Sequence, residues 1–492
     1  MKKNIKGTFY KDSSIYLTGS LITAGIGLAV LPFYTRYLSP SDYGIIGLFL
    51  MFGEVSVGLL SMGLQSASYR YYFKYKNDIA VFKSINSSIL IFNIFTYTLS
   101  FVGIYFLANW LSSNIFHDQI TGKIIILSFI SGCMEYFITY FSYLLIAQLR
   151  SISYTVITTT RSMLTVIFAV YFILNYSLTY MALVNAIILT QVIVIICLIA
   201  LTVNLFSLNF SFTNLKQPFN YSYPMVLRMI IGTIHGSFSK IILTNFTGLT
   251  HVGYYVLAEK IGGTLKLIKD AIDKSWYAFF MEKVKENTQD SKKSIETRYF
   301  EISFLLMLFG FGIICFSEEL IKLLTTKDYY LAMYIIPIFV LYNILGIINS
   351  LSIPQINYSE KNKYILPASI INVIINISLN ILLIPIYGVF GAISALIIAH
   401  FLGSMTHLYF GFKVCPLPLN KWKIRGIFFY TLLFTFPIYI IMMTDIHFLL
   451  KISIKFAIIL LFVLFGNLAK YISLKKIIVY ANNKFSNLSL RF

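Results

Sequence analysis

The chain has 492 residues, of which 58% are hydrophobic and only 12% are charged, and its formal net charge is +20. Soluble domains are about 45–50% apolar and about 25% charged, so this composition excludes a soluble globular protein and indicates a polytopic membrane protein. Lysine and arginine are enriched in the cytoplasmic loops of such proteins, so we do not take the positive charge as a sign of nucleic-acid binding. The four cysteines show no CxxC or His/Cys spacing, and we predict neither disulfides nor a metal site.

Fourteen apolar segments are long enough to cross a bilayer, which takes about 20 residues. The first follows a basic N-terminus but has no A-x-A-like cleavage site, so we interpret it as a retained helix rather than a signal peptide. The predicted spans are residues 13–35, 44–66, 84–108, 122–147, 153–174, 178–204, 223–246, 253–280, 299–324, 330–352, 364–384, 388–412, 424–444 and 448–471.

The charges between these spans predict the orientation. With the N-terminus in the cytoplasm, the inside segments carry about four times as many lysines and arginines as the outside segments. Lys451 and Lys455 count among the few outside charges. One missed span would invert every later segment and remove this bias. We therefore expect an even number of spans, with both termini in the cytoplasm.

The chain contains an internal repeat. A shift of about 209 residues superposes the spans that start near 44, 122, 153 and 178 on those that start near 253, 330, 364 and 388. The same shift brings Tyr43-Gly44 beside Val252-Gly253. Six spans per unit give a parallel repeat, a transporter architecture in which the site lies between the halves. The predicted fold is all-α and MATE-like. It has a six-helix bundle at 1–215, a second at 216–415 around a central cavity, and two further transmembrane helices with a cytoplasmic tail at 416–492.

Several predicted spans carry charge where lipid disfavours it. A charge at the centre of a membrane helix costs roughly 2.5–3.5 kcal/mol, so these side chains must face water or other helices. Charge of this kind inside a membrane span indicates a functional site by default. We predict that the substrate-binding residues are Arg161, Arg228, His235, Lys240, Lys266 and Lys269. As alternatives, Lys266–Asp270 and Lys269–Asp273 form neutralising i, i+4 pairs, and His235 serves packing.

Carboxylates inside the spans are candidates for coupling transport to a proton or sodium gradient, and a purely structural role is the alternative for them. These candidates are Glu54, Glu135, Glu259, Asp270 and Asp273. We expect no catalytic residue, no metal and no other cofactor.

Three stretches resemble the polysaccharide and O-antigen (Wzx-type) flippases of the multidrug/oligosaccharidyl-lipid/polysaccharide (MOP) exporter superfamily. They are LPFYTRYLSPSDYGIIGLFLMFGEVSVGLLSMGLQSASYRYY (31–72), TNFTGLTHVGYYVLAEKIGGTLKLIKDAIDKSWYAFF (244–280), and 372–396 with Asn376, Asn380, Pro385, Gly388, Gly391 and Ala392. The resemblance implies two six-helix bundles around a cavity and no enzymatic activity. It implies the flipping of undecaprenyl-diphosphate-linked oligosaccharide in a bacterial cytoplasmic (inner) membrane, for O-antigen and lipopolysaccharide or another surface polysaccharide. A polysaccharide polymerase and chain-length machinery are the expected protein partners.

Two other functions are consistent with a polytopic chain. A MATE-type drug or cation antiporter should have a cavity dominated by carboxylates, whereas the innermost charges here are mainly positive. A polysaccharide polymerase or glycosyltransferase needs a sizeable outside loop with catalytic groups. The longest predicted outside loop, about 109–121, offers only His117 and Asp118.

Overall fold

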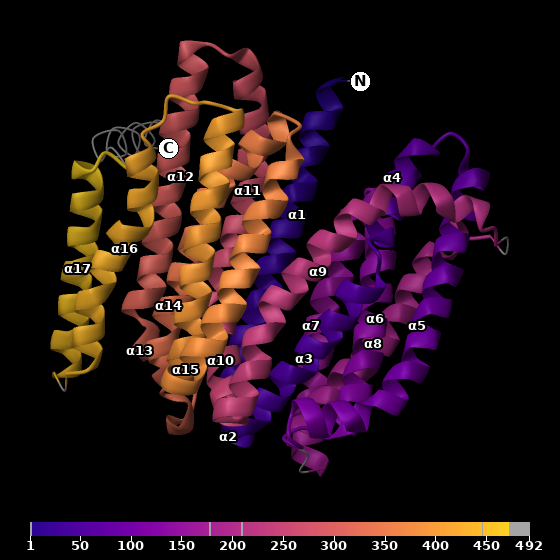
Figure 1. Ribbon diagram of the computed structural model, residues 1–492, viewed down its shortest axis with the longest axis horizontal. Helices are drawn as coiled ribbons and strands as arrows, with labels where there is room; N and C mark the ends of the chain where they lie inside the picture. Colours follow the sequence, from indigo (N-terminus) through magenta and orange to yellow (C-terminus); the bar gives the residue numbers. More distant parts are fainter. Residues whose placement is uncertain (1, 177–178, 208–209, 445, 472–492) are drawn as a thin grey trace, which may run out of the picture. The chain divides into compact units, whose positions relative to one another are not determined.

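The computed structural model describes residues 2–176, 179–207, 210–444 and 446–471, without the side chains of 2–14, 223–225, 227–228, 234–235 and 362. All regular elements of the described part are helices (Figure 1). They are, in chain order, α1 (Lys2–Ala29), α2 (Leu31–Tyr37), α3 (Pro40–Leu60), α4 (Leu64–Lys74), α5 (Ile79–Ile115), α6 (Gly122–Ala147), α7 (Ser151–Tyr176), α8 (Tyr180–Thr202), η1 (Val203–Leu205), α9 (Thr213–Thr247), α10 (Leu249–Gly262), α11 (Thr264–Glu286), α12 (Gln289–Cys315), α13 (Ser317–Leu324), η2 (Lys327–Tyr329), α14 (Ala332–Tyr358), η3 (Asn362–Tyr364), α15 (Ile365–Val414), α16 (Lys421–Met442) and α17 (Phe448–Leu468).

Each predicted span coincides with one or two of these helices. Within the described residues, eleven helical segments are long and apolar enough to cross a membrane, and one of them is the 50-residue α15. The count leaves out α9, whose side chains are described only in part, and the α10–α11 segment, which is broken and highly charged. The all-helical, multi-pass fold predicted from the sequence is confirmed.

The helix α15 contains the two predicted spans 364–384 and 388–412. Gly388 has a φ of +56°, a left-handed value that glycine adopts without a steric penalty. A Cβ atom on Gly391 would lie 2.2 Å from the carbonyl oxygen of Leu383, so the chain reverses direction between these residues. The short gap predicted near 384–388 is therefore a tight turn.

The chain divides into two compact units. The first contains residues 1–257, 322–331 and 372–396, and the second contains residues 258–321, 332–371 and 397–492. These units are not the predicted bundles 1–215 and 216–415, whose boundaries remain a prediction.

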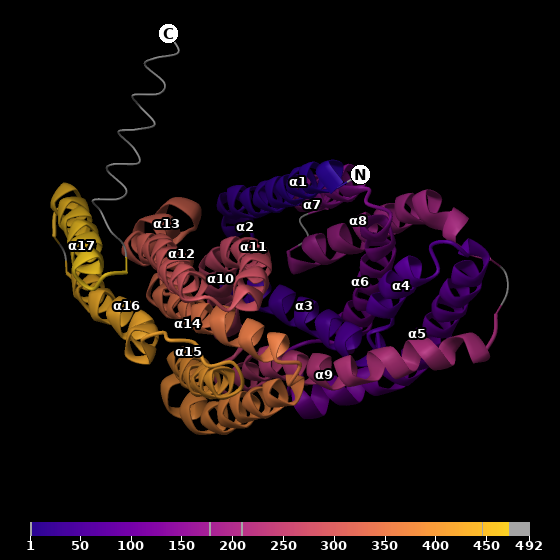
Figure 2. The same ribbon diagram turned by 90° about the horizontal axis from the view of Figure 1, so that it is seen from above.

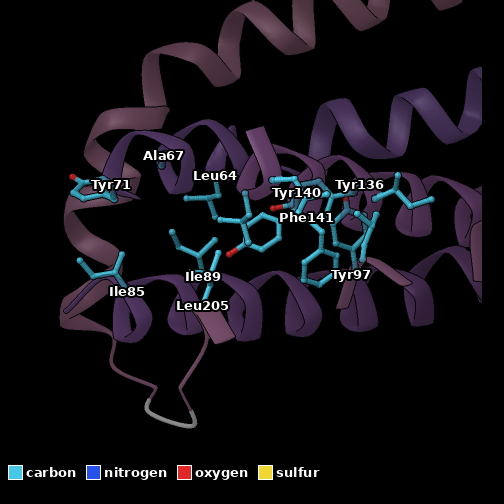
Figure 3. Close-up of a cluster of buried hydrophobic side chains, with 14 of the residues drawn as sticks. Leu64, Ala67, Tyr71, Ile85, Ile89, Tyr97, Tyr136, Tyr140, Phe141 and Leu205 are labelled. Carbon is cyan, nitrogen blue, oxygen red and sulfur yellow. The ribbon is translucent and has the colours of Figure 1, made fainter. Parts of the chain in front are cut away.

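The first unit has a core built around aromatic side chains on α5 and α6 (Figure 3). The rings of Tyr97 and Tyr136 stack with centroids 5.2 Å apart. Asn86 lies fully buried beside them, and its side-chain oxygen accepts hydrogen bonds of 2.6 Å from Ser68 and from Tyr140. A buried amide of this kind is stable in the core only because its polar atoms are satisfied.

At one edge of the same unit, α1 runs alongside α7 (Figure 2). A Cβ atom on Gly19 would lie 2.4 Å from a methyl carbon of Thr155, so the glycine permits this close approach. Elsewhere in the unit, the N-terminal turns of α3 and α10 cross at Gly44 and Gly253, where a Cβ on either residue would overlap the other helix. Small residues of this kind let membrane helices pack backbone to backbone.

The second unit packs α12 and α14 against α16 and α17. The rings of Phe311 and Phe462 stack with centroids 4.4 Å apart, and Gly466 lies against Phe304.

The region predicted as a single span, 253–280, forms two helices in the structure, because Gly263 separates α10 from α11. Two successive glycines lower the helix propensity at this point, which explains the break.

Candidate functional site

In the first unit, α6 and α7 present an ion pair inside two predicted spans. The guanidinium of Arg161 donates to both carboxylate oxygens of Glu135, with nitrogen–oxygen distances of 3.0 and 2.5 Å. The Arg161 side chain is 28% exposed and the Glu135 side chain is 38% exposed, so both can be reached from outside the protein core. The bidentate geometry is the one in which arginine binds a carboxylate or a phosphate most strongly.

A third helix orients this pair. Gln191 of α8 is almost fully buried, and its side-chain nitrogen donates to Glu135 at 3.1 Å. Ser131, one turn before Glu135, donates to the side-chain oxygen of Gln191 at 3.0 Å. The carboxylate is therefore held from two sides, by Arg161 and by Gln191. Gln191 and Ser131 were not predicted from the sequence, although a glutamine within an apolar span is itself a signal of a polar contact.

Lys240 also lies in the first unit, on α9. Its side chain is buried, and its ammonium lies 6.0 Å from the ring centroid of Tyr255, a cation–π distance. Arg228 and His235 belong to the same helix, but their side chains lie outside the described residues, so their predicted roles remain predictions.

The helix α11 of the second unit carries the other predicted cations. Lys269 forms an ion pair of 2.6 Å with Asp273, one turn away, and its ammonium is 4.0 Å from Asp270. The neutralising i, i+4 alternative therefore holds for this lysine. No ion pair joins Lys266 to Asp270 in the described part of the chain, and the Lys266 side chain is exposed.

The lysine stem of Lys269 lies against a glycine of the neighbouring helix α14. A Cβ atom on Gly346 would lie 3.2 Å from Cε of Lys269. The indole nitrogen of Trp276 donates to the carbonyl oxygen of Ser350 at 2.7 Å and fixes α11 against the same helix. Because the Lys269 side chain is only 13% exposed, the pair with Asp273 stabilises a charge that would otherwise be costly to bury.

The two remaining carboxylate candidates are differently placed. Glu54 lies on an exposed side of α3 in the first unit, and Glu259 is half-buried on α10 in the second. Both have interaction partners. In the described residues no group of three or more His, Cys, Asp or Glu side chains could hold a metal ion.

A buried cluster of four charges was not predicted. Glu318 and Glu319 begin the short helix α13, and Lys451 and Lys455 lie one turn apart on α17. The ammonium of Lys451 is 2.9 Å from Glu318, and that of Lys455 is 2.7 Å from Glu319 and 3.5 Å from Glu318. Lys455 is fully buried. Both lysines were predicted to be charges of outside segments. They lie on α17 and form ion pairs with these carboxylates, and their side of the membrane stays a prediction.

The first unit also has an apolar groove between α3, α5 and α6. Its volume is about 420 Å³, and Phe52, Leu59, Gly103, Leu107 and Phe129 are among the residues that line it. Nothing lies within 4 Å of the position of a Cβ atom on Gly103, so the glycine leaves this space open. An apolar groove in helices of membrane-spanning length is suited to a hydrocarbon chain.

Helices of membrane-spanning length define a multi-pass membrane protein, and solved structures agree with this fold. Lipid II flippase MurJ, in an inward closed conformation, matches with a TM-score of 0.65 and 17% identity over 94% of this chain and 98% of that chain. A multidrug resistance MATE family transporter of the MOP superfamily, in an inward-facing conformation, matches with a TM-score of 0.61 and 13% identity. This match covers 84% of this chain and 95% of that one.

The profile of the family described as "Polysaccharide biosynthesis protein" matches residues 9–272, more than half of the chain. The chain therefore belongs to this family, which is a family of transporters and not of enzymes. The probable low-salt glycan biosynthesis flippase Agl15 of Haloferax volcanii is 24% identical over 201 residues, 41% of this chain and 43% of Agl15, so the match spans less than half of that relative. Lsg locus putative protein 1 of Haemophilus influenzae is 21% identical over 417 residues, 80% of this chain and 98% of that protein.

Proposed function

We propose that the protein is a flippase that moves an undecaprenyl-diphosphate-linked oligosaccharide, an O-antigen or other surface polysaccharide repeat unit, from the cytoplasmic to the outer leaflet. It resides in a bacterial cytoplasmic membrane with both termini inside, and it makes or breaks no bond. The observation that carries the proposal is the bidentate Arg161–Glu135 pair, which is partly exposed and joins two predicted membrane spans. Family membership and the glycan flippase among its relatives support the same substrate class.

The pair suggests how a diphosphate is bound. Glu135 occupies both donor nitrogens of Arg161 when no substrate is present, which keeps the cation neutralised within the membrane. A phosphoryl group of a diphosphate also offers two acceptor oxygens to a guanidinium and carries more negative charge, so it replaces Glu135 at Arg161. Glu135 keeps its hydrogen bond from Gln191 in that state, so its carboxylate still has one hydrogen-bond partner. Lys240 supplies a second positive charge in the same unit.

Other groups complete the proposal. Arg228, His235, Lys266 and Lys269 contribute further contacts to the diphosphate and sugar. Glu54, Glu135, Glu259, Asp270 and Asp273 are the groups through which a proton or sodium gradient would drive transport. The apolar groove between α3, α5 and α6 offers a surface for part of the polyprenyl chain. A polymerase and chain-length machinery receive the flipped product.

The close crossing of α3 and α10 supports alternating access. In the predicted orientation, the Gly44–Gly253 contact lies at the outer end of its helices, and it closes that end of the first unit. Residues of the 322–331 segment strengthen it, because the hydroxyl of Tyr329 donates to the carbonyl oxygen of Leu38 at 2.9 Å. Release of substrate to the outer leaflet then requires these contacts to open.

The decisive experiment follows lipid-linked repeat units in a host that lacks the gene. Loss of surface polysaccharide, with lipid-linked units accumulating on the cytoplasmic face, is the expected result, and wild-type protein should restore export. Arg161→Ala should fail to restore it at normal membrane levels. Arg298→Ala, which removes the arginine of the exposed Arg298–Glu301 pair, is the matched control and should behave as wild type. Intact surface polysaccharide in the deletion strain, or export of a cationic dye by the purified protein, would contradict the proposal.

A further inference from the structure

A small basic pocket lies in the second unit where α15 ends and α16 begins. It has a volume of about 240 Å³ and is lined by Leu408, Tyr409, Phe412, Lys413, Lys421 and Arg425. Three of its six lining residues are cations, and the other three are apolar or aromatic. Sites for drug-sized ligands have roughly 300–1,000 Å³, so this pocket suits a ligand as small as a phosphate-containing headgroup.

Aromatic rings hold two of these cations in place. The ammonium of Lys421 lies 4.9 Å from the ring centroid of Phe412, and the guanidinium carbon of Arg425 lies 5.2 Å from the ring centroid of Trp422. Among the described residues, no carboxylate forms an ion pair with Lys413, Lys421 or Arg425. The three side chains are exposed, so their positive charge is available to an anion from outside the protein.

The position of the pocket indicates a membrane–water interface. Trp422 is 77% exposed and Tyr409 is 64% exposed, which is typical of the aromatic belt that flanks a bilayer core. From the pocket, two exposed apolar stripes run along the helices that enter the membrane. Leu402 lies two turns before Tyr409 on α15, while Phe429 and Phe436 follow Arg425 at intervals of four and seven residues on α16. A ligand that fits both features has an anionic head and hydrocarbon chains.

We propose that this pocket binds the headgroup of an anionic phospholipid, with its phosphate between Lys413, Lys421 and Arg425 and its acyl chains along the two stripes. Basic pockets between transmembrane helices bind anionic lipid heads by this combination of charge and depth. A free phosphate would use the cations but not the stripes, and a zwitterionic lipid would place a positive group among three cations. The proposal does not depend on the flippase activity.

Native mass spectrometry of the purified full-length protein can test this site. The protein is titrated with phosphatidylglycerol and with phosphatidylcholine, and wild type is compared with the triple variant Lys413→Gln, Lys421→Gln, Arg425→Gln. Each basic group near a membrane surface contributes roughly a fivefold gain in affinity, so the triple variant should bind phosphatidylglycerol on the order of a hundredfold more weakly. Phosphatidylcholine binding should be weak in both proteins.

Two controls keep the result interpretable. The variant Lys283→Gln, Lys285→Gln, Arg298→Gln removes three charges from the α11 and α12 surface and should bind phosphatidylglycerol as wild type does. The unfolding temperatures of both variants should match that of wild type, since the changed side chains are solvent-facing. Equal phosphatidylglycerol affinity in wild type and the pocket variant would overturn the proposal. Displacement of the lipid by inorganic phosphate alone would overturn the role of the stripes, and preferential binding of an undecaprenyl diphosphate would assign the pocket to substrate entry instead.

Discussion

Gly44 and Gly253 lie 209 residues apart and contact each other through their backbones. A Cβ atom on Gly44 would lie 2.1 Å from the carbonyl oxygen of Leu249, and one on Gly253 would lie 1.9 Å from the carbonyl oxygen of Pro40. Pro40 and Leu249 are also 209 residues apart. The shift of 209 residues therefore converts the Gly44–Leu249 contact into the Gly253–Pro40 contact, with the roles of the two helices exchanged. Such a reciprocal contact is the pattern of a two-fold interface. The repeat that was visible in the sequence is a packing symmetry in the structure.

The same relationship makes a prediction about the transport cycle. Gly44→Val or Gly253→Val places a branched side chain where no Cβ fits, so the outer end of the first unit should not close. Export should be abolished while the protein remains in the membrane, and a cysteine introduced nearby should become accessible to an external thiol reagent. Gly312→Ala is the control, because nothing lies within 4 Å of a Cβ at that position. Unchanged export by the valine variants would show that this closure is not part of the cycle.

Substrate binding and stability can be separated at the Glu135–Arg161 pair. Arg161→Gln leaves the Glu135 carboxylate without its cation, and it should cost about 1–3 kcal/mol of stability. The double variant Arg161→Gln, Glu135→Gln removes both charges and should recover most of that loss. Export should stay absent in both, because the cation that receives the diphosphate is missing. Thermal unfolding of purified protein and export in the deletion strain provide the two readouts. Recovery of export together with stability would assign the pair a structural role only.

The buried cluster on α13 and α17 should be the stronger stabilising element. Lys455→Met removes a fully buried cation that lies 2.7 Å from Glu319, whose side chain is 20% exposed, and 3.5 Å from the buried Glu318. Removal of one member of a buried pair costs about 3–5 kcal/mol. The unfolding temperature in detergent should fall markedly. Lys283→Met, which removes the cation of the partly exposed Lys283–Glu286 pair, should change stability by less than about 1 kcal/mol. A small effect of Lys455→Met would mean that water reaches the cluster.

His251 gives an expectation for pH. Burial lowers the pKa of this imidazole below its ordinary value of 6.5, and its Nδ1 atom is buried without a hydrogen-bond partner in the described part of the chain. The unfolded chain therefore binds the proton more readily than the folded chain. The stability that neutral His251 contributes is complete above pH 6.5 and is lost as the pH falls below that value. His251 lies two residues before Gly253, so acid should weaken the closure there.

Unfolding temperatures measured between pH 8 and pH 5 can check this expectation. His251→Gln should flatten the loss of stability on the acid side, whereas His117→Gln, at an exposed position, should follow wild type. Identical acid profiles for wild type and His251→Gln would show that another group controls the response.

The sequence by itself determined the class of the protein, its helical spans and its family. The physical reason is the bilayer, in which every backbone polar group must be satisfied within a helix. For that reason, the hydropathy along the sequence is enough to predict the membrane spans. It also located the charges of Glu135, Arg161 and Lys269 within those spans, and the short gap between residues 384 and 388.

Only the tertiary structure decided which of these charges meet. Arg161 and Glu135 are 26 residues apart, while Lys455 and Glu319 are 136 apart, and no local pattern joins either pair. The direction of a side chain from a membrane helix depends on helix rotation and on neighbours from distant parts of the chain. For that reason the carboxylate partners of Lys455 were not predicted, and Gln191 was not foreseen as the residue that holds Glu135 in place.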